Sequence, residues 1–288
     1  MECLYEGDCL KIMQTLLSES VDMIFADPPF NVGKKYGGKS NVDNRSDYYE
    51  WCASWIAEGC RLLKPTGTFY LMTIARHVFR MGVEMEKNGV FINKVEWRNV
   101  SASHSKRGFW SSTQPIVVFG KTDQFKFNTY AQRRKITQLR WGGYKTKPQG
   151  QLLDYWDDIH FVYAGSIAHP EAILKPGTSQ KVHPTQMPIS LAARCISFST
   201  NECDTVLDPF NGSGTTGVAC VKLGRHFIAL KKRANTSNYL VSDGQMSAYI
   251  GHSFKQTTDS KGSDNSSKPY LIYQERGLMR KRLFASLH

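Results

Sequence analysis

The sequence predicts an α/β protein with a doubly wound, mostly parallel sheet, and three observations predict this fold. Strand-like apolar runs alternate with helical patterns along most of the chain, one such run ends in an acidic corner, and another leads through a glycine-rich turn into a helix. The chain has 288 residues, of which 41% are hydrophobic, so it can bury the core of one large or two modest domains.

The first 120 residues carry the alternation most clearly. Apolar or alternating runs predict strands over residues 3–5, 21–25, 68–72, 91–97 and 115–119. Helical spacing of apolar residues predicts helices over residues 8–17, 47–63 and 76–87. Asp8 suits the cap of the first helix; alternatively, its carboxylate accepts a hydrogen bond from a ligand amine at a strand end. Residues 31–47 are rich in Gly, Lys, Asn and Ser and are expected to form a mobile, lid-like loop.

The acidic corner is the sequence Asp27-Pro28-Pro29-Phe30, directly after the run of residues 21–25. Parallel sheets bind ligands at the carboxyl ends of their strands, where Asp27 is expected to lie. The two prolines stiffen the corner and leave carbonyl oxygens as acceptors, and Phe30 adds a flat apolar face. These features suit a planar group that carries an amine, with an ordinary turn as the simpler alternative.

The glycine-rich turn lies between a strand predicted at residues 205–208 and a helix predicted at residues 218–223. Gly212, Gly214 and Gly217 form the pattern G-x-G-x-x-G in the strand–turn–helix context of nucleotide sites. Glycines let the backbone approach a ligand, and the helix N-terminus favours an anionic group. Two more elements are predicted beside this unit, a helix over residues 188–199 and a strand over residues 224–230.

The middle of the chain is strongly basic, which points to an anionic partner. The whole chain has a net charge of +12 and a pI of about 9.3, so nucleic acid is the first candidate partner and an anionic membrane surface the second. Tyr130, Trp141 and Tyr144 are interleaved with the basic residues, a mixture that suits a phosphate backbone and exposed bases. A solvated basic loop is the alternative. The candidate DNA-binding residues are Lys126, Arg133, Arg134, Lys135, Arg140, Lys145 and Lys147.

The cysteines and the apolar runs predict a cytoplasmic protein without a metal site. The seven cysteines are scattered and form no C-x-x-C pair, so we expect reduced thiols and no zinc. No apolar run approaches the ~18 residues of a membrane-spanning helix, and no signal peptide is visible.

Taken together, the motifs DPPF, HPTQMP and DPFNGSGTT, in this order, resemble those of the amino-group DNA methyltransferases that use S-adenosylmethionine. The order is that of the permuted, beta-type branch, which methylates adenine N6 or cytosine N4, and the resemblance covers about residues 3–230. It implies a Rossmann-like methyltransferase fold with an inserted target-recognition region. The boundaries expected are 1–120 for the catalytic half, 121–180 for target recognition, 181–240 for the cofactor half, and 241–288 for an atypical, partly disordered C-terminal segment.

The same resemblance assigns roles to individual residues. The catalytic loop would be Asp27, Pro28, Pro29 and Phe30. Residues that would contact the cofactor are Asp8, Cys9, Asp27, His183, Pro184, Thr185, Gln186, Asp208, Phe210, Asn211, Gly212, Ser213, Gly214, Thr215, Thr216 and Lys231. Asp8 would meet the adenine ring of the cofactor. Residues 183–186 would lie near its methionine end.

The hypothesis is therefore a site-specific adenine-N6 methyltransferase acting on double-stranded DNA, where the target nucleotide must be flipped out. By the resemblance, an aspartate at the first position of DPPF favours adenine, and cytosine N4 is the alternative. Lys231 stands where the family usually has an acid, so a catalytically weakened DNA-binding relative is a second alternative. A dehydrogenase that uses NADP is a third, because a basic residue after the glycine pattern can meet a 2′-phosphate. A homodimer and a cognate restriction endonuclease are possible partners.

Overall fold

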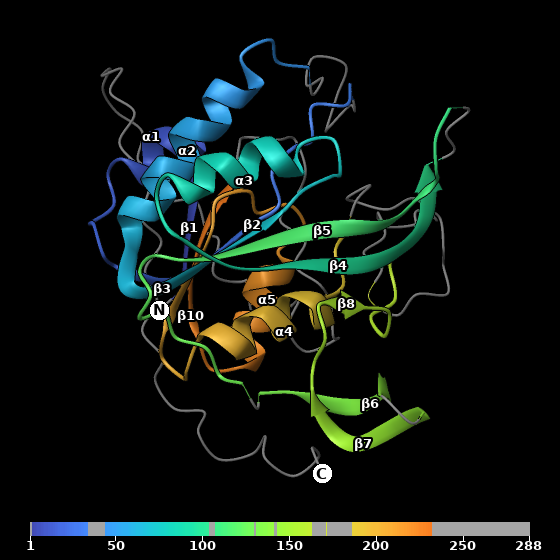
Figure 1. Ribbon diagram of the computed structural model, residues 1–288. Helices are drawn as coiled ribbons and strands as arrows, with labels where there is room; N and C mark the ends of the chain where they lie inside the picture. The colour runs from blue at the N-terminus through green and yellow to red at the C-terminus, as the bar shows by residue number, and fades with distance from the viewer. Residues whose placement is uncertain are drawn as a thin grey trace, which may run out of the picture.

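The structure is a computed structural model, which describes residues 2–33, 44–103, 107–129, 131–140, 143–162, 171 and 186–231 (Figure 1). Its strands are β1 (Glu2–Glu6), β2 (Val21–Ala26), β3 (Leu63–Met72), β4 (Val90–Ser103), β5 (Ser111–Gly120), β6 (Arg133–Arg140), β7 (Gly143–Gln151), β8 (Tyr155–Trp156), β9 (Thr205–Asp208) and β10 (His226–Lys231). Its helices are α1 (Cys9–Met13), α2 (Tyr48–Leu62), α3 (Val78–Glu86), α4 (Ile189–Ser199) and α5 (Thr215–Lys222).

The main sheet has the order β1-β10-β9-β2-β3-β5-β4-β8. Neighbouring strands from β1 to β3 are parallel, whereas β5 runs antiparallel to both β3 and β4. The antiparallel pair follows from the chain itself, because β4 and β5 are consecutive strands joined without an intervening helix. The prediction of a doubly wound, mostly parallel α/β sheet is confirmed.

Strands β9 and β2 mark the point where the strand order reverses. From β9 the chain continues through α5 to β10 on one side, and from β2 it continues through α2 to β3 on the other. Parallel pairing of Ile24 with Leu207 holds β2 and β9 together. In open α/β sheets, ligands bind outside the carboxyl ends of the strands at such a switch point. Here those ends carry the acidic corner and the glycine-rich turn.

Helices cover both faces of the sheet (Figure 1). Helices α1, α2 and α3 bury one core, in which Trp55, Phe69 and Met81 are fully enclosed. Helices α4 and α5 bury a second core on the opposite face, around residues such as Phe25 and Ile196. Apolar burial on both faces explains why β2 shows no polar alternation: all six of its residues are buried.

Several elements differ from their sequence-based expectations: α1 ends at Met13 rather than at residue 17, and β4 and β5 are longer than the strands predicted at residues 91–97 and 115–119. Strand β3 begins at Leu63 rather than at residue 68. Val21 pairs with Leu63 and Met23 pairs with Thr68, so residues 64–67 form a bulge opposite Asp22. Within the basic region, where no strand was expected, β6 and β7 form a separate antiparallel hairpin that lies apart from the main sheet (Figure 1).

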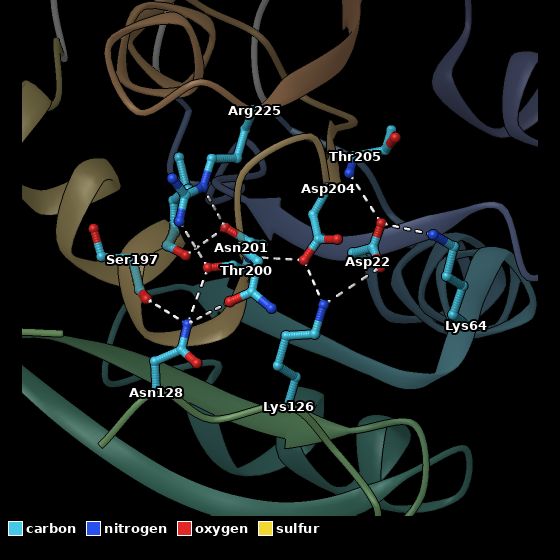
Figure 2. Close-up of polar contacts among 11 residues, drawn as sticks. Asp22, Lys64, Lys126, Asn128, Ser197, Thr200, Asn201, Asp204, Thr205 and Arg225 are labelled. Atoms are coloured by element: carbon cyan, nitrogen blue, oxygen red, sulfur yellow. Dashed lines mark hydrogen bonds and ion pairs between the residues drawn. The ribbon is translucent and has the colours of Figure 1, made fainter. Parts of the chain in front are cut away.

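The start of the basic region is tied to the amino edge of the main sheet, where β2 and β9 begin (Figure 2). Lys126 forms an ion pair with Asp204, its ammonium lies 3.9 Å from Asp22, and its backbone N–H donates to Thr66 O at 2.8 Å. The Asn128 amide donates to the carbonyls of Ser197 and Thr200 at 3.1 and 3.0 Å. This stretch therefore packs as part of the core domain.

Residues after β7 are anchored on α4. The buried Arg194 forms two hydrogen bonds to Asp158, at 2.9 and 2.7 Å, and its guanidinium lies 5.0 Å above the ring of Trp156. Trp97 of β4 donates to the Ile159 carbonyl at 2.9 Å. These contacts hold the segment after β7 against the second core.

Candidate active site at the carboxyl edge of the sheet

The acidic corner and the glycine-rich turn follow neighbouring strands at the same edge of the sheet. Asp208 ends β9, and Asp27 comes directly after β2. Met23 pairs with Val206 and Ile24 with Leu207, so the two parallel strands end at the same edge of the sheet. Paired strands lie about 4.8 Å apart, so the two motifs face a common region.

Side chains from other elements hold the corner in place. The Tyr48 hydroxyl, at the start of α2, donates to the Pro29 carbonyl at 2.8 Å. His77, just before α3, has Nε2 2.8 Å from the Phe30 carbonyl oxygen. Pro28 is buried, whereas Asp27, Pro29 and Phe30 are each partly exposed. Two carbonyls of the corner are thus fixed by hydrogen bonds, while Asp27 keeps access to solvent.

The contact between His77 and Phe30 defines the proton on the imidazole ring. A carbonyl oxygen only accepts, so Nε2 donates to Phe30 O. In the neutral ring Nδ1 then accepts, and the Tyr49 hydroxyl lies 2.8 Å from it. The guanidinium of Arg80 lies 4.3 Å above the Tyr49 ring. The result is a chain of contacts from Arg80 through Tyr49 and the buried His77 to the corner.

Asn31 closes the loop that follows the corner. Its side-chain amide donates to the Arg45 carbonyl at 3.0 Å and accepts from the Arg45 N–H at 2.6 Å. Asn31 has a positive φ of 53°, a conformation that asparagine tolerates better than most residues. The Arg45 guanidinium forms an ion pair with Asp47 and lies 5.0 Å above the ring of Trp51. The loop expected at residues 31–47 therefore has a fixed base; residues 34–43 lie outside the described part.

Two glycines of the turn, Gly214 and Gly217, are required for different structural reasons. Gly214 precedes α5 with φ of 88°, which favours glycine. At Gly217 an added Cβ would lie 3.0 Å from the ring of Phe227 in β10, so this glycine permits close packing of helix on strand. The Thr215 hydroxyl donates to the Met187 carbonyl at 3.2 Å. The turn thus presents the N-terminus of α5 at the carboxyl edge of the sheet.

Asp208 is a buried carboxylate in this turn. It is 8% exposed, and burial raises its pKa from 3.8 to about 6, opposed by hydrogen bonds from Thr216 and from the Phe210 N–H at 2.9 Å. The Phe210 ring packs edge-on against Trp51 and Trp55 of α2, with ring centroids 5.6 and 4.9 Å away. The start of the glycine turn is thereby anchored on α2, the helix that also holds the acidic corner through Tyr48.

The remaining cofactor candidates occupy the ends of β1 and β10. Asp8 is exposed and caps α1, accepting from the Lys11 N–H at 3.2 Å, so the capping interpretation is confirmed. Cys9 is partly buried, and burial raises the pKa of its thiol to about 12, so it is neutral near pH 7. Lys231 pairs in register with Glu6, and burial lowers its pKa while Glu6 opposes that shift.

Of the motif HPTQMP, the structure describes its second half. Gln186 is buried and its side-chain amide donates to the Glu171 carbonyl, and the Glu171 carboxylate accepts from the Ile189 N–H at 2.9 Å. Met187 contacts the glycine turn through Thr215. His183, Pro184 and Thr185 lie outside the described residues, as do residues 232–288, which include the segment 241–288.

The basic candidates fall into two places. Lys126 lies at the amino edge of the sheet and pairs with two carboxylates, which favours a structural role. The others lie on the β6–β7 hairpin: Arg133, Arg134, Lys135, Arg140, Lys145 and Lys147. Their part in DNA binding stays a prediction.

Sequence reasoning missed Tyr48, His77 and Asn31 as supports of the corner. Asn31 adjoins the motif and could have been noticed there. The hydrogen bonds of Tyr48 and His77 span 19 and 47 residues, so only the fold brings them to the corner. In the part of the chain that the structure describes, no three His, Cys, Asp or Glu side chains gather as a metal site would require, and no helix there is long and apolar enough to cross a bilayer.

Comparison with known families and proteins agrees with this geometry. A family model described as DNA methylase, covering N6 and N4 enzymes, matches residues 21–241. The type II methyltransferase M.BamHI of Bacillus amyloliquefaciens is 33% identical over 247 residues, 79% of this chain. The type II methyltransferase M.HpaI of Haemophilus parainfluenzae is 30% identical over 226 residues, 78% of this chain. The alignments span 54% of the length of the first relative and 68% of the second.

Solved structures share the fold. The cytosine-N4-specific PvuII DNA methyltransferase has a TM-score of 0.62 at 20% identity, over 89% of this chain and 87% of that one. The complex of M1.HpyAVI with SAM has a TM-score of 0.52 at 24% identity, over 81% of this chain and 94% of that one. At these identities the likeness establishes the architecture.

Proposed function

This chain belongs to the DNA methylase family of N6 and N4 enzymes, and on that premise we propose that it transfers a methyl group from S-adenosylmethionine to the N6 amino group of a flipped adenine in DNA. The observation that carries the proposal is the placement of Asp27 and Asp208 at the carboxyl ends of adjacent parallel strands. A cofactor bound at the glycine-rich turn and a base bound at the acidic corner would therefore lie next to each other.

The residues around the glycine turn suit the cofactor. Gly214 has a positive φ, and Gly217 packs closely against Phe227. Because glycines carry no side chain, a ligand can approach the backbone of the turn. The N-terminus of α5 favours the carboxylate of a methionine moiety, and the buried Asp208 offers a negative group to its ammonium. When bound, S-adenosylmethionine supplies an electrophilic methyl group on a sulfonium.

The corner suits the amine that receives the methyl group. The lone pair of an exocyclic amine is delocalised into the base, so the amine is a weak nucleophile. Asp27 and the Pro28 carbonyl can accept its two N–H groups and favour a pyramidal nitrogen, while Phe30 stacks on the base. The neighbouring carbonyls of Pro29 and Phe30 are already engaged by Tyr48 and His77, which fixes the orientation of the acceptors. Asp27 need not be a strong base, because the amine becomes acidic as methylation proceeds.

Incubation of purified protein with DNA and labelled S-adenosylmethionine tests the proposal. Digestion of the DNA to nucleosides separates N6-methyladenine from N4-methylcytosine, and sequencing of DNA from cells that express the protein maps the site. We expect N6-methyladenine at one short sequence. If the label appears in N4-methylcytosine, the target is cytosine rather than adenine. If no label enters DNA under conditions in which a control enzyme methylates it, the proposed activity is refuted.

A second candidate is a DNA-binding relative with weakened catalysis, and Lys231 favours it. This lysine ends β10, where an acid for the ribose hydroxyls is expected. Calorimetry with S-adenosylmethionine distinguishes the candidates, because DNA affinity without heat of cofactor binding supports the weakened relative. In that case Lys231→Glu should restore cofactor binding. Sedimentation and co-expression with a nuclease would test the proposed homodimer and endonuclease partner.

A further inference from the structure

The β4–β5 ribbon extends beyond the edge of the sheet that carries the site. Ala26 pairs with Leu71, and Leu71 pairs with Val117, so Val117 is level with the end of β2. The pairing of β4 with β5 continues outward to Ser103 and Ser111 (Figure 1). Trp110 lies five residues before Pro115, whose carbonyl accepts from Thr73 N at the end of β3. The four residues of β5 before Pro115, residues 111–114, measure about 13 Å of extended strand.

Large aromatic side chains are exposed at the outer end of this ribbon. Phe109 is 103% exposed and Trp110 is 58% exposed, and Arg107 beside them is also exposed. By contrast, residues 115–120 of β5 are buried, so the change from core strand to exposed ribbon occurs at the edge of the sheet. Two adjacent exposed aromatics close to an exposed arginine indicate a surface that is covered in a complex.

Duplex DNA fits this surface in shape and chemistry. The major groove admits a two-stranded β-ribbon and is about 8.5 Å deep, less than the length of the protruding ribbon. Strand β5 is two strand spacings, about 10 Å, from β2, so a duplex whose target base reaches Asp27 passes the ribbon. The chain carries a net charge of +12, which favours a polyanion over a second copy of the same chain.

We propose that the β4–β5 ribbon is a DNA-contacting arm, separate from the β6–β7 hairpin, whose Phe109 ring packs against bases of the duplex near the target nucleotide. This inference rests on the proposed function. Apolar side chains that enter DNA commonly pack against unstacked bases, and base flipping unstacks the neighbours of the target.

Fluorescence anisotropy with a labelled duplex that carries the mapped methylation site tests the arm. We expect Phe109→Ala to weaken binding roughly tenfold, as removal of a stacked aromatic does, without changing the slope of affinity against salt, because no charge is removed. Phe109→Trp should restore most of the affinity. Leu17→Ala is the matched control, since Leu17 is 80% exposed in the connection from α1 to the amino end of β2 and should leave binding unchanged.

Other outcomes overturn the inference. If Phe109→Ala binds the duplex as the wild type does, the ring makes no contact with DNA. If it lowers the sedimentation coefficient of the free protein while DNA affinity persists, the ribbon is an interface between copies of the chain. In both cases methylation by the wild type continues, so failure of the arm is distinct from failure of the proposed function, in which the wild type methylates no DNA.

Discussion

The two ends of β2 and β9 carry carboxylates in opposite circumstances. At the amino edge, Asp22 is 5% exposed and accepts from Lys64 at 2.8 Å and from the Thr205 N–H at 2.9 Å, and Asp204 pairs with Lys126 (Figure 2). At the carboxyl edge, the partly exposed Asp27 stands on a proline corner, and Asp208 accepts from backbone and hydroxyl groups.

The difference assigns the acids at the amino edge to stability and those at the carboxyl edge to the proposed chemistry, on the same two strands. Lysines neutralise the amino-edge acids and link β2, β9 and the stretch after β5, so these acids stabilise the fold. At the carboxyl edge the strands end in a stiff corner and a glycine turn, where ligands of such sheets bind. Substitutions at the two edges should therefore change different measurements.

The largest effect is expected at Asp27. Asp27→Asn removes the charge that orients the amine, and we expect methyl transfer to fall at least about a thousandfold, which corresponds to ~4 kcal/mol of barrier. The urea midpoint should change little because Asp27 is partly exposed. A mutant with undiminished single-turnover rate would remove Asp27 from the mechanism.

Asp22 should show the opposite behaviour. Asp22→Ala leaves the Thr205 N–H without its acceptor and separates two lysines from their shared carboxylate, so we expect a loss of about 3 kcal/mol of unfolding free energy. The turnover of the folded protein, measured well below its melting temperature, should stay unchanged. Lys64→Ala is the control, with a loss below about 1 kcal/mol because Lys64 is 40% exposed. Equal losses for both variants would contradict the central place given to Asp22.

His77 tests whether the corner must be held from behind. His77→Ala removes the donor to Phe30, and we expect a roughly thirtyfold fall in kcat, about 2 kcal/mol, with little change in the KM for cofactor. His77→Gln keeps a donor amide and should recover part of the rate. If KM rises and kcat does not, His77 acts on binding rather than on the geometry of the corner.

Asp208 gives the smallest effect, a pH dependence of stability. The folded state raises the pKa of this carboxyl to about 6, so its stabilising contribution is complete below the unfolded value of 3.8 and is lost as pH rises through 6. Relative to Asp208→Asn, the wild type should gain about 1 kcal/mol of unfolding free energy between pH 7.5 and pH 5. Urea unfolding of both proteins across this range measures it, and parallel curves would show that Asp208 does not titrate there.

Local patterns predicted the strand ends but not their supports. Asp27 and Asp208 follow apolar runs, so strand-end reasoning alone locates both acids. The antiparallel course of β5, the bulge at residues 64–67 and the β6–β7 hairpin depend on pairings between segments, which periodicity does not encode. Lys126 was expected on the DNA surface because of its charge, yet the fold pairs it with Asp22 and Asp204. Only the packing of α2 and α3 brings Tyr48 and His77 to the corner.

The clasp between Asn31 and Arg45 has a consequence for how such a protein diversifies. Both hydrogen bonds go to main-chain atoms of Arg45, so they tolerate replacement of that side chain. A segment inserted between two fixed points changes the closure entropy only slowly with its length, about 0.6 kcal/mol for each doubling. The segment between Asn31 and Arg45 can therefore change in sequence or length without moving Asp27, four positions before Asn31.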